Sequence, residues 1–191
     1  HLRSALFYSN TFGACLRKSE ALRVKRAHLQ RTGDHLTLFI PWSKTDQHGV
    51  GYSIPLPKDT ESGIPLLAVF ERRDAFYASR GWADSSPLFP SARGKGEALK
   101  TATSLMDDLL SVYVPAAEAA GLRIPAHFRI SSHSFRRGGI NALLRAAREA
   151  GFRGWELESL IMRYGRWRDP ATIRKYIFES DPAVAGIAAG M

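Results

Sequence analysis

Two short segments in which apolar residues recur at every second position are the feature that most constrains the fold of this chain. Every second residue is apolar in HLTLFI (35–40), and the alternation recurs in GYSIPLP (51–57), where prolines mark a sheet edge or strand end. This pattern is typical of half-buried strands. The polar segment WSKTDQHGV between them suits the loop of an antiparallel hairpin, with Lys44 near its tip. We therefore predict one small antiparallel sheet.

Most of the other patterned segments favour helices, because their apolar residues recur at helical spacing between Gly and Pro boundaries. The sequence predicts helices at 2–12, 16–24, 65–80, 101–120, 134–150, 156–164 and 171–178. Pro115 is expected to kink or split the fourth. The last has the strongest start signal, with Asp169 as N-cap and Pro170 at the first helical position. The predicted fold class is α+β, mainly α, in a single domain covering residues 1–191.

The charge balance points to a polyanionic partner. The 191 residues include 27 Lys and Arg against 18 Asp and Glu, which gives a net charge of +9. Eleven of those basic residues but only four of the acidic ones lie between Arg129 and Lys175. Such a concentration favours nucleic acid over an anionic membrane surface or simple solubility.

Several classes of protein are excluded or disfavoured. No apolar run approaches the roughly 18 residues that cross a bilayer, and no signal-peptide pattern is present, so we expect an intracellular protein with no membrane partner. Cys15 is the single cysteine, which excludes an internal disulfide framework. The histidines lack metal-ligand spacing, and neither paired carboxylates nor a P-loop are found. We expect any chemistry to need no metal and no cofactor.

Two C-terminal motifs carry candidate functional residues. In HSFRRGG, His133 and Arg136 are three residues apart and share one helical face, where a helix start would suit a phosphate. The alternative interpretation is a surface arginine and a capping histidine. Further on, Trp167 precedes the capped helix and Tyr176 follows nine residues later. Both are often packing residues, but the basic neighbours of Tyr176 argue against burial of its ring.

The segments LRKSEAL, HSFRRGG and GRW, followed by a tyrosine nine residues after the tryptophan, together resemble the catalytic domain of the tyrosine recombinases, the phage-integrase family. That domain carries, in order, Arg and Glu on an early helix, Lys in a β-hairpin, HxxR on a later helix, His or Trp, and Tyr. The matching residues span nearly the whole chain and are Arg17, Glu20, Lys44, His133, Arg136, Trp167 and Tyr176. Trp167 stands where the family more often has histidine, and we expect the family's N-terminal core-binding domain to be absent.

The resemblance implies a reaction that cleaves and rejoins DNA without metal or ATP. Tyr176 would attack phosphorus to form a 3′-phosphotyrosine, and Lys44 would protonate the leaving 5′-oxygen. Arg17, Arg136 and the Trp167 indole N–H would hold the phosphate, as charge on its nonbridging oxygens requires.

Two supporting roles follow from the same resemblance. His133 would act as base or phosphate donor, and Glu20 would orient His133 or Arg17. Six further arginines are predicted to contact DNA phosphates: Arg137, Arg145, Arg148, Arg166, Arg168 and Arg174.

The expected activity is site-specific recombination or integration of a mobile genetic element. The expected partner is double-stranded DNA, bound by a homo-tetramer in which two dimers bridge two sites. The tail 179–191 would be exchanged between subunits, or would be a frayed terminus. The protein would lie with the DNA, in a bacterial cytoplasm or nucleoid or in a host nucleus. The alternatives are a type IB topoisomerase, a non-catalytic DNA-binding module with the same fold, and, less favoured, a basic RNA-binding domain.

Overall fold

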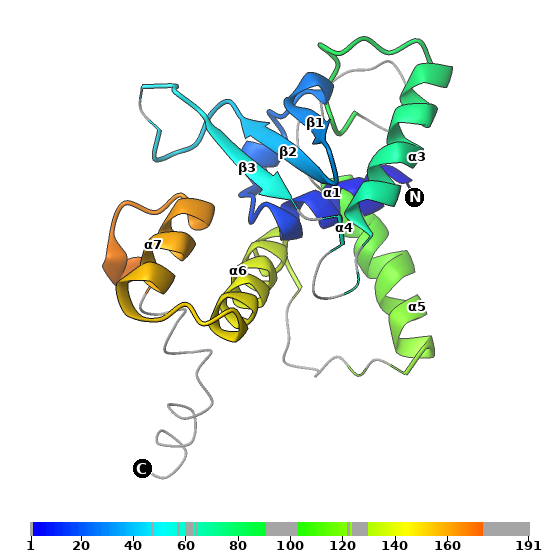
Figure 1. The fold of residues 1–191 in the computed structure, drawn as a ribbon. Helices are drawn as coiled ribbons and strands as arrows, with labels where there is room; N and C mark the ends of the chain where they lie inside the picture. Colours follow the sequence, from blue (N-terminus) through cyan, green and yellow to red (C-terminus); the bar gives the residue numbers. More distant parts are fainter. Residues whose placement is uncertain are drawn as a thin grey trace.

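The structure is a computed structural model that describes residues 2–46, 48–56, 58–59, 63, 65–90, 103–121, 123 and 130–173 (Figure 1). Its elements run in the order α1 (Leu2–Gly13), α2 (Lys18–Ala21), the 3₁₀ helix η1 (Arg26–His28), β1 (Leu29–Thr32), β2 (His35–Ile40), β3 (Tyr52–Leu56), α3 (Leu66–Ser79), α4 (Thr103–Asp108), the π-helix η2 (Leu109–Tyr113), α5 (Val114–Ala119), α6 (Ser132–Glu149) and α7 (Gly154–Gly165). The predicted fold class, mainly helical with a small antiparallel sheet, is confirmed.

The sheet has the order β1-β2-β3 with both pairs antiparallel. The predicted hairpin of β2 and β3 is present, and Leu38 on the central strand pairs with Leu29 on one side and Ile54 on the other. Strand β1 was not predicted, because Leu29 is its only buried residue and the strand lacks alternation. A turn through Gly33, which has φ 61°, joins it to β2.

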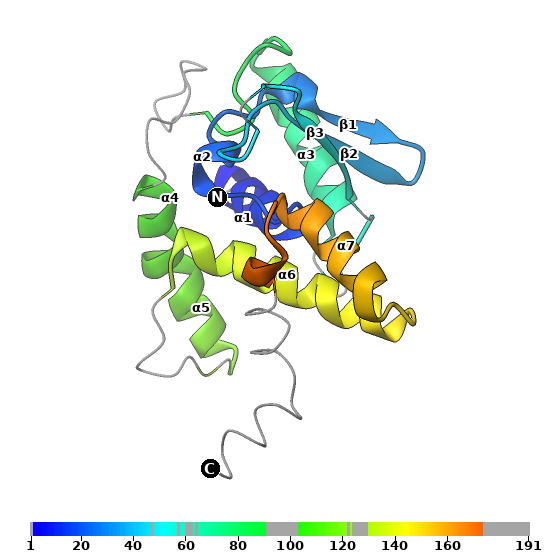
Figure 2. The same ribbon diagram turned by 90° about the vertical axis from the view of Figure 1, so that its left-hand side faces the viewer.

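Helix α1 crosses the middle of the molecule, with α3 and α6 packed against it (Figures 1 and 2). One buried apolar cluster joins α1 to the sheet, α3 and α4. A second cluster joins α6 to α7 and to Ile173. The close approach of α6 to α1 depends on Gly139, since a Cβ at that position would lie 2.0 Å from the carbonyl oxygen of Phe12.

Tertiary contacts shorten the second predicted helix, which was expected to cover 16–24 and is reduced to α2. Arg17 is extended, with φ −75° and ψ 151°, so the helix begins only at Lys18. At the other end, the chain leaves the helix to pair with a distant loop. The Val24 carbonyl accepts a hydrogen bond from the Leu88 N–H, and Lys25 forms a β-bridge with Pro87.

The predicted break near Pro115 takes the form of a π-helical turn between α4 and α5. Proline has no N–H to donate to the carbonyl four residues earlier, so regular α-helical bonding is interrupted there. In the π-helical turn, the Val114 N–H donates to the Leu109 carbonyl instead.

The start of the last predicted helix is confirmed. The Asp169 carboxylate accepts a hydrogen bond from the Ala171 N–H at 2.9 Å, and the chain is helical from Pro170 to Ile173, the last described residue. Within the described ranges, no helix is long and apolar enough to cross a membrane.

Candidate active site

The turn after α1 creates the first part of the site. Cys15 has the left-handed φ of 49°, which reverses the chain and brings Arg17 to the N-terminus of α2. Glu20, one turn into α2, reaches back. Its Oε2 accepts from the Arg17 backbone N–H and its Oε1 from the Arg17 Nη1, each at 2.7 Å. The predicted pairing of Arg17 with Glu20 is therefore present, and Arg17 remains partly exposed.

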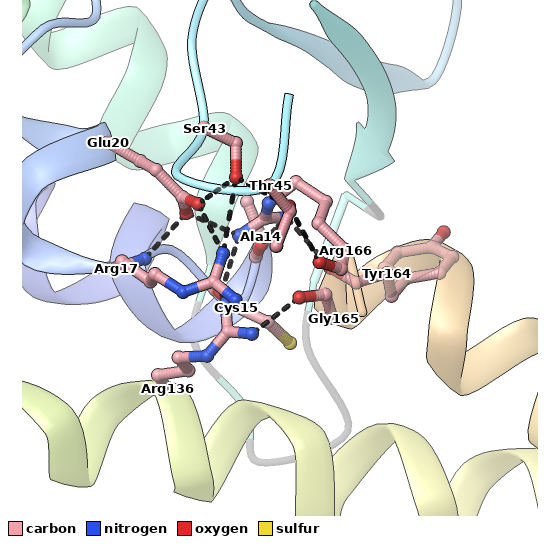
Figure 3. A network of polar contacts seen from close by, with 10 residues as sticks. All are labelled: Ala14, Cys15, Arg17, Glu20, Ser43, Thr45, Arg136, Tyr164, Gly165 and Arg166. Atoms are coloured by element: carbon pink, nitrogen blue, oxygen red, sulfur yellow. Dashed lines mark hydrogen bonds and ion pairs between the residues drawn. The ribbon is translucent and has the colours of Figure 1, made fainter. Parts of the chain in front are cut away.

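Glu20 is the centre of a buried polar network (Figure 3). Besides Arg17, its carboxylate accepts from the Ser43 hydroxyl at 2.8 Å and from the Arg166 Nη2 at 2.6 Å. The side chains of Glu20 and Arg166 are both fully buried. Burial alone would raise the pKa of Glu20. The charge and hydrogen bond of Arg166, together with the hydrogen bonds from the Arg17 backbone N–H and the Ser43 hydroxyl, outweigh burial and lower the pKa. Glu20 is therefore an anion at neutral pH.

Helix α6 supplies Arg136 from below this network. Its guanidinium is buried and donates to the carbonyl oxygens of Cys15 and Gly165 (Figure 3). It also lies 5.0 Å from the centre of the Trp167 ring. Burial, followed by the nearby charges of Arg17 and Arg166, lowers the pKa of Arg136 to about 10. Arg136 still carries a proton at neutral pH.

The alternative interpretation of HSFRRGG, a surface arginine and a capping histidine, is wrong for both residues. Arg136 is a buried residue, and the helix is capped by Ser131, whose hydroxyl accepts from the His133 N–H at 3.3 Å. His133 itself lies exposed in the first turn of α6. Partial burial, and then the charges of Arg136, Arg137 and Arg17, lower the pKa of His133. Its imidazole is therefore neutral at pH 7 and able to accept a proton.

The loop between β2 and β3 brings Lys44 to the same place. Lys44 lies in this loop, as predicted, and is exposed. Ser43 joins the loop to Glu20, and the Thr45 hydroxyl donates to the Arg166 carbonyl at 3.0 Å. The Asp46 carboxylate accepts from the Gly51 N–H at 2.7 Å and from the Val50 N–H at 3.2 Å, and these hydrogen bonds lower its pKa.

Sequence reasoning missed Ser43, Thr45 and Asp46. The only local signal was that the polar side chains of Ser43 and Thr45 flank Lys44 on both sides.

The prediction that Arg166 contacts a DNA phosphate is wrong. Its buried guanidinium donates to the carbonyl oxygens of Ala14, Cys15 and Tyr164 as well as to Glu20. Its Nη1 and Nη2 donors are therefore committed to the fully buried Glu20 carboxylate and to three carbonyls instead of DNA, although Arg166 belongs to the same basic stretch as the exposed arginines.

The other predicted phosphate contacts that the structure describes lie in two segments of the chain. On α6, Arg137 and Arg145 are exposed and Arg148 is partly buried, and Arg168 is exposed next to Trp167. Arg174, Tyr176 and the tail 179–191 lie outside the described residues. Across the part of the chain that the structure describes, no group of three or more His, Cys, Asp or Glu side chains could hold a metal ion.

The site therefore gathers three arginines around one carboxylate, with Arg17 facing partly outward. Because guanidinium groups stay protonated and Glu20 is ionised, the cluster of Arg17, Arg136, Arg166 and Glu20 carries an excess of positive charge. A planar guanidinium can donate two hydrogen bonds to one phosphate. The arrangement is suited to hold a phosphate beside Lys44, His133 and Trp167.

Comparison with solved structures defines the class of fold, which is that of a site-specific DNA recombinase. The chain is similar to crystal structures of the site-specific recombinase XerH. One is bound to difH substrate in a pre-cleavage complex, with TM-score 0.66 and 16% sequence identity over 92% of this chain. Another is bound to palindromic difH substrate in a post-cleavage complex, with TM-score 0.64 and 16% identity over 97% of this chain. The chain spans 42% and 44% of those chains. No protein-family model matches, and no curated protein matches by sequence.

Proposed function

We propose that this chain is the catalytic part of a tyrosine-type site-specific DNA recombinase, which cleaves and rejoins DNA strands through a phosphotyrosine. The observation that carries the proposal is the convergence of three segments far apart in the sequence. Arg17 with Glu20, the loop of Lys44, and Arg136 meet in one hydrogen-bonded network, and the Trp167 ring lies against the Arg136 guanidinium. The set of Arg17, Lys44, His133, Arg136 and Tyr176 argues against a protein that only binds DNA, because such a protein has no need of the tyrosine. The similarity to a recombinase bound to its DNA substrate supports the same function.

In the proposed reaction the Tyr176 oxygen attacks phosphorus and the bond from phosphorus to the 5′-oxygen breaks. The tyrosine proton passes to the neutral imidazole of His133. The Lys44 ammonium donates a proton to the departing 5′-oxygen, which leaves as a hydroxyl. The 3′-phosphotyrosine retains the energy of the broken bond, so a second 5′-hydroxyl can reverse the step without ATP.

Charge on the nonbridging oxygens is compensated by arginine and by the Trp167 indole N–H. Arg17 reaches the phosphate directly from its partly exposed position. Arg136 reaches it by exchanging one carbonyl partner, on Cys15 or Gly165, for a phosphate oxygen. Loss of one such donor is expected to cost about 10²- to 10³-fold in cleavage rate, as for an oxyanion-hole donor.

The proposal includes the DNA partner and the assembly. Exposed arginines on α6 and after Trp167 would follow the phosphate backbone without reading sequence, so binding would weaken steeply with salt. Four copies would act on two DNA sites, with the tail 179–191 exchanged between them.

Covalent capture tests the proposed function. The protein is incubated in EDTA with fragmented genomic DNA of its source and denatured in SDS, and the DNA that stays attached is sequenced. Adducts are expected for the wild type and for Tyr52→Phe, a matched control on β3, and none for Tyr176→Phe. Adducts of dispersed sequence, with relaxation of supercoiled plasmid, would indicate a topoisomerase. Salt-sensitive binding without adducts would refute the proposal in favour of a DNA-binding module.

A further inference from the structure

Arg166 adopts an unusual backbone conformation next to the proposed site. It is the C-cap residue of α7, with the left-handed angles φ 54° and ψ 45°. This conformation is ordinarily taken by glycine at a helix end, because a side chain makes it unfavourable. Within the described ranges, Cys15 is the only other residue besides glycines with positive φ, and its carbonyl is bound by Arg166. Such strain persists only where surrounding contacts hold it, and it concentrates at functional sites.

The Arg166 side chain holds the turn that carries Arg17. Nη1 donates to the Ala14 carbonyl at 3.1 Å, and Nη2 donates to the Cys15 carbonyl at 2.8 Å. Nη2 also donates to Glu20 at 2.6 Å, and Glu20 in turn binds both the backbone and the guanidinium of Arg17. Arg166 therefore sets the position of Arg17 through a fully buried ion pair (Figure 3).

The Arg166 backbone holds the loop that carries Lys44. Its carbonyl oxygen accepts the Thr45 hydroxyl at 3.0 Å, directly beside Lys44 in the sequence. The left-handed conformation aims this carbonyl at the loop while the side chain extends to α2 (Figure 3). Its neighbours Gly165 and Trp167 both contact the Arg136 guanidinium.

We propose that Arg166 is a positioning residue for DNA cleavage, one that fixes the segments of Arg17 and Lys44 relative to each other without touching DNA. This inference rests on the proposed function for its catalytic consequence. Displacement of reacting groups by about 1 Å can cost about 10²-fold in rate. Arg166→Lys keeps a positive charge next to Glu20 but loses the planar fork that serves several acceptors at once. We expect it to slow cleavage by about 10- to 100-fold and to leave DNA affinity unchanged, because the side chain is buried.

The first test needs no activity and measures amide hydrogen exchange in the folded protein. Arg166→Lys is expected to lose protection in two separate segments, residues 14–21 and the Lys44 loop at 41–46, while amides within α7 keep theirs. Arg163→Lys, an exposed position on the same helix, is the matched control and is expected to match the wild type. Unchanged protection in the two segments, or equal loss throughout the protein, would overturn the proposal.

The second test measures single-turnover cleavage of the DNA recovered by covalent capture, at saturating protein. A merely structural defect lowers the fraction of active molecules, whereas a positioning defect lowers the rate constant. Thr45→Val, which removes the hydrogen bond to the Arg166 carbonyl and a contact with the Ser43 hydroxyl within the loop, is expected to slow the same step and serves as a second variant. Replacing the bridging 5′-oxygen by sulfur creates a better leaving group that needs less proton donation. This substrate is expected to restore most of the loss in Thr45→Val and part of the loss in Arg166→Lys.

The outcomes separate the two proposals. If the wild type cleaves and Arg166→Lys cleaves at the same rate, the positioning role fails and the recombinase function stands. If the wild type forms no adduct but Arg166→Lys loses protection in both segments, the recombinase function fails and the structural role of Arg166 stands.

Discussion

Glu20 gives the sharpest quantitative test of the site, because it is a buried anion with three partners among the described residues. Its carboxylate binds Arg17, Ser43 and Arg166. Glu20→Gln keeps the size of the side chain but removes the charge and turns one acceptor into a donor that faces other donors. Breaking a buried ion pair by removing one partner costs about 3–5 kcal/mol. That is a large share of the roughly 5–15 kcal/mol by which a domain is stable.

The expected effect on melting temperature follows from the size of the protein. A domain of 150–250 residues shifts by about 2–4 °C per kcal/mol, so Glu20→Gln is expected to lower Tm by about 6–20 °C at pH 7. Glu71→Gln is the matched control. Glu71 forms an exposed pair with Arg31 at 3.0 Å, and such pairs contribute about 0–1 kcal/mol. The measurement is thermal unfolding followed by circular dichroism.

The pH dependence of the melting temperature provides a second, independent test of the role of Glu20. The pKa of Glu20 is lowered in the folded state, so as the pH falls below about 4.5, its ordinary value, the unfolded chain binds a proton first. The stability that Glu20 contributes is present above that value and is lost as the pH drops towards the lower folded pKa. The gap in Tm between wild type and Glu20→Gln should therefore narrow on acidification. A gap that stays constant from pH 7 to pH 3, or a shift no larger than that of Glu71→Gln, would refute the reasoning.

Three further predictions concern other parts of the molecule. Gly139→Ala is expected to lower the free energy of unfolding in urea by about 1–3 kcal/mol through overpacking. Gly138→Ala, whose added Cβ would meet only a side chain at 3.1 Å, should have little effect, and equal effects would contradict the packing of α1 on α6. The pKa of His133, followed by NMR, should lie below 6.5 and should rise in Arg137→Gln, since removal of a nearby positive charge favours the protonated imidazole; an unchanged titration would argue against that contact. Asp46→Asn should increase hydrogen exchange at the amides of residues 50 and 51. The wild type should show the same increase only at a pH below the ordinary range of carboxyl pKa values, because the pKa of Asp46 is lowered and the side chain stays charged within that range.

Local patterns were sufficient wherever one segment decides its own structure. Alternation predicted β2 and β3 and placed Lys44 in their loop, because side chains on a strand take alternate faces whatever else the protein contains. Asp169 and Pro170 predicted the start of a helix, because a cap is formed within three residues. The resemblance to the tyrosine recombinases could also be recognised from the sequence alone, because it depends on the order along the chain of Arg17, Glu20, His133, Arg136 and Trp167.

Only the tertiary structure decided which arginines are buried. Arg137 and Arg166 are alike in the sequence, as parts of one basic stretch. Arg166 is the one that meets the Glu20 carboxylate, 146 residues away. The sequence around Arg166 does not reveal this partner. A guanidinium is buried only where hydrogen-bond acceptors are brought to it, and here the packing of α1, α2 and α7 brings them from distant parts of the chain. The same reason explains why α2 is shorter than predicted and why β1 was not predicted. The limits of both elements are set by segments that lie beside them in space and not in sequence. The sequence by itself thus determined most of the elements and the set of candidate site residues, and the tertiary contacts decided which of those residues are exposed and which are buried and hold the others in place.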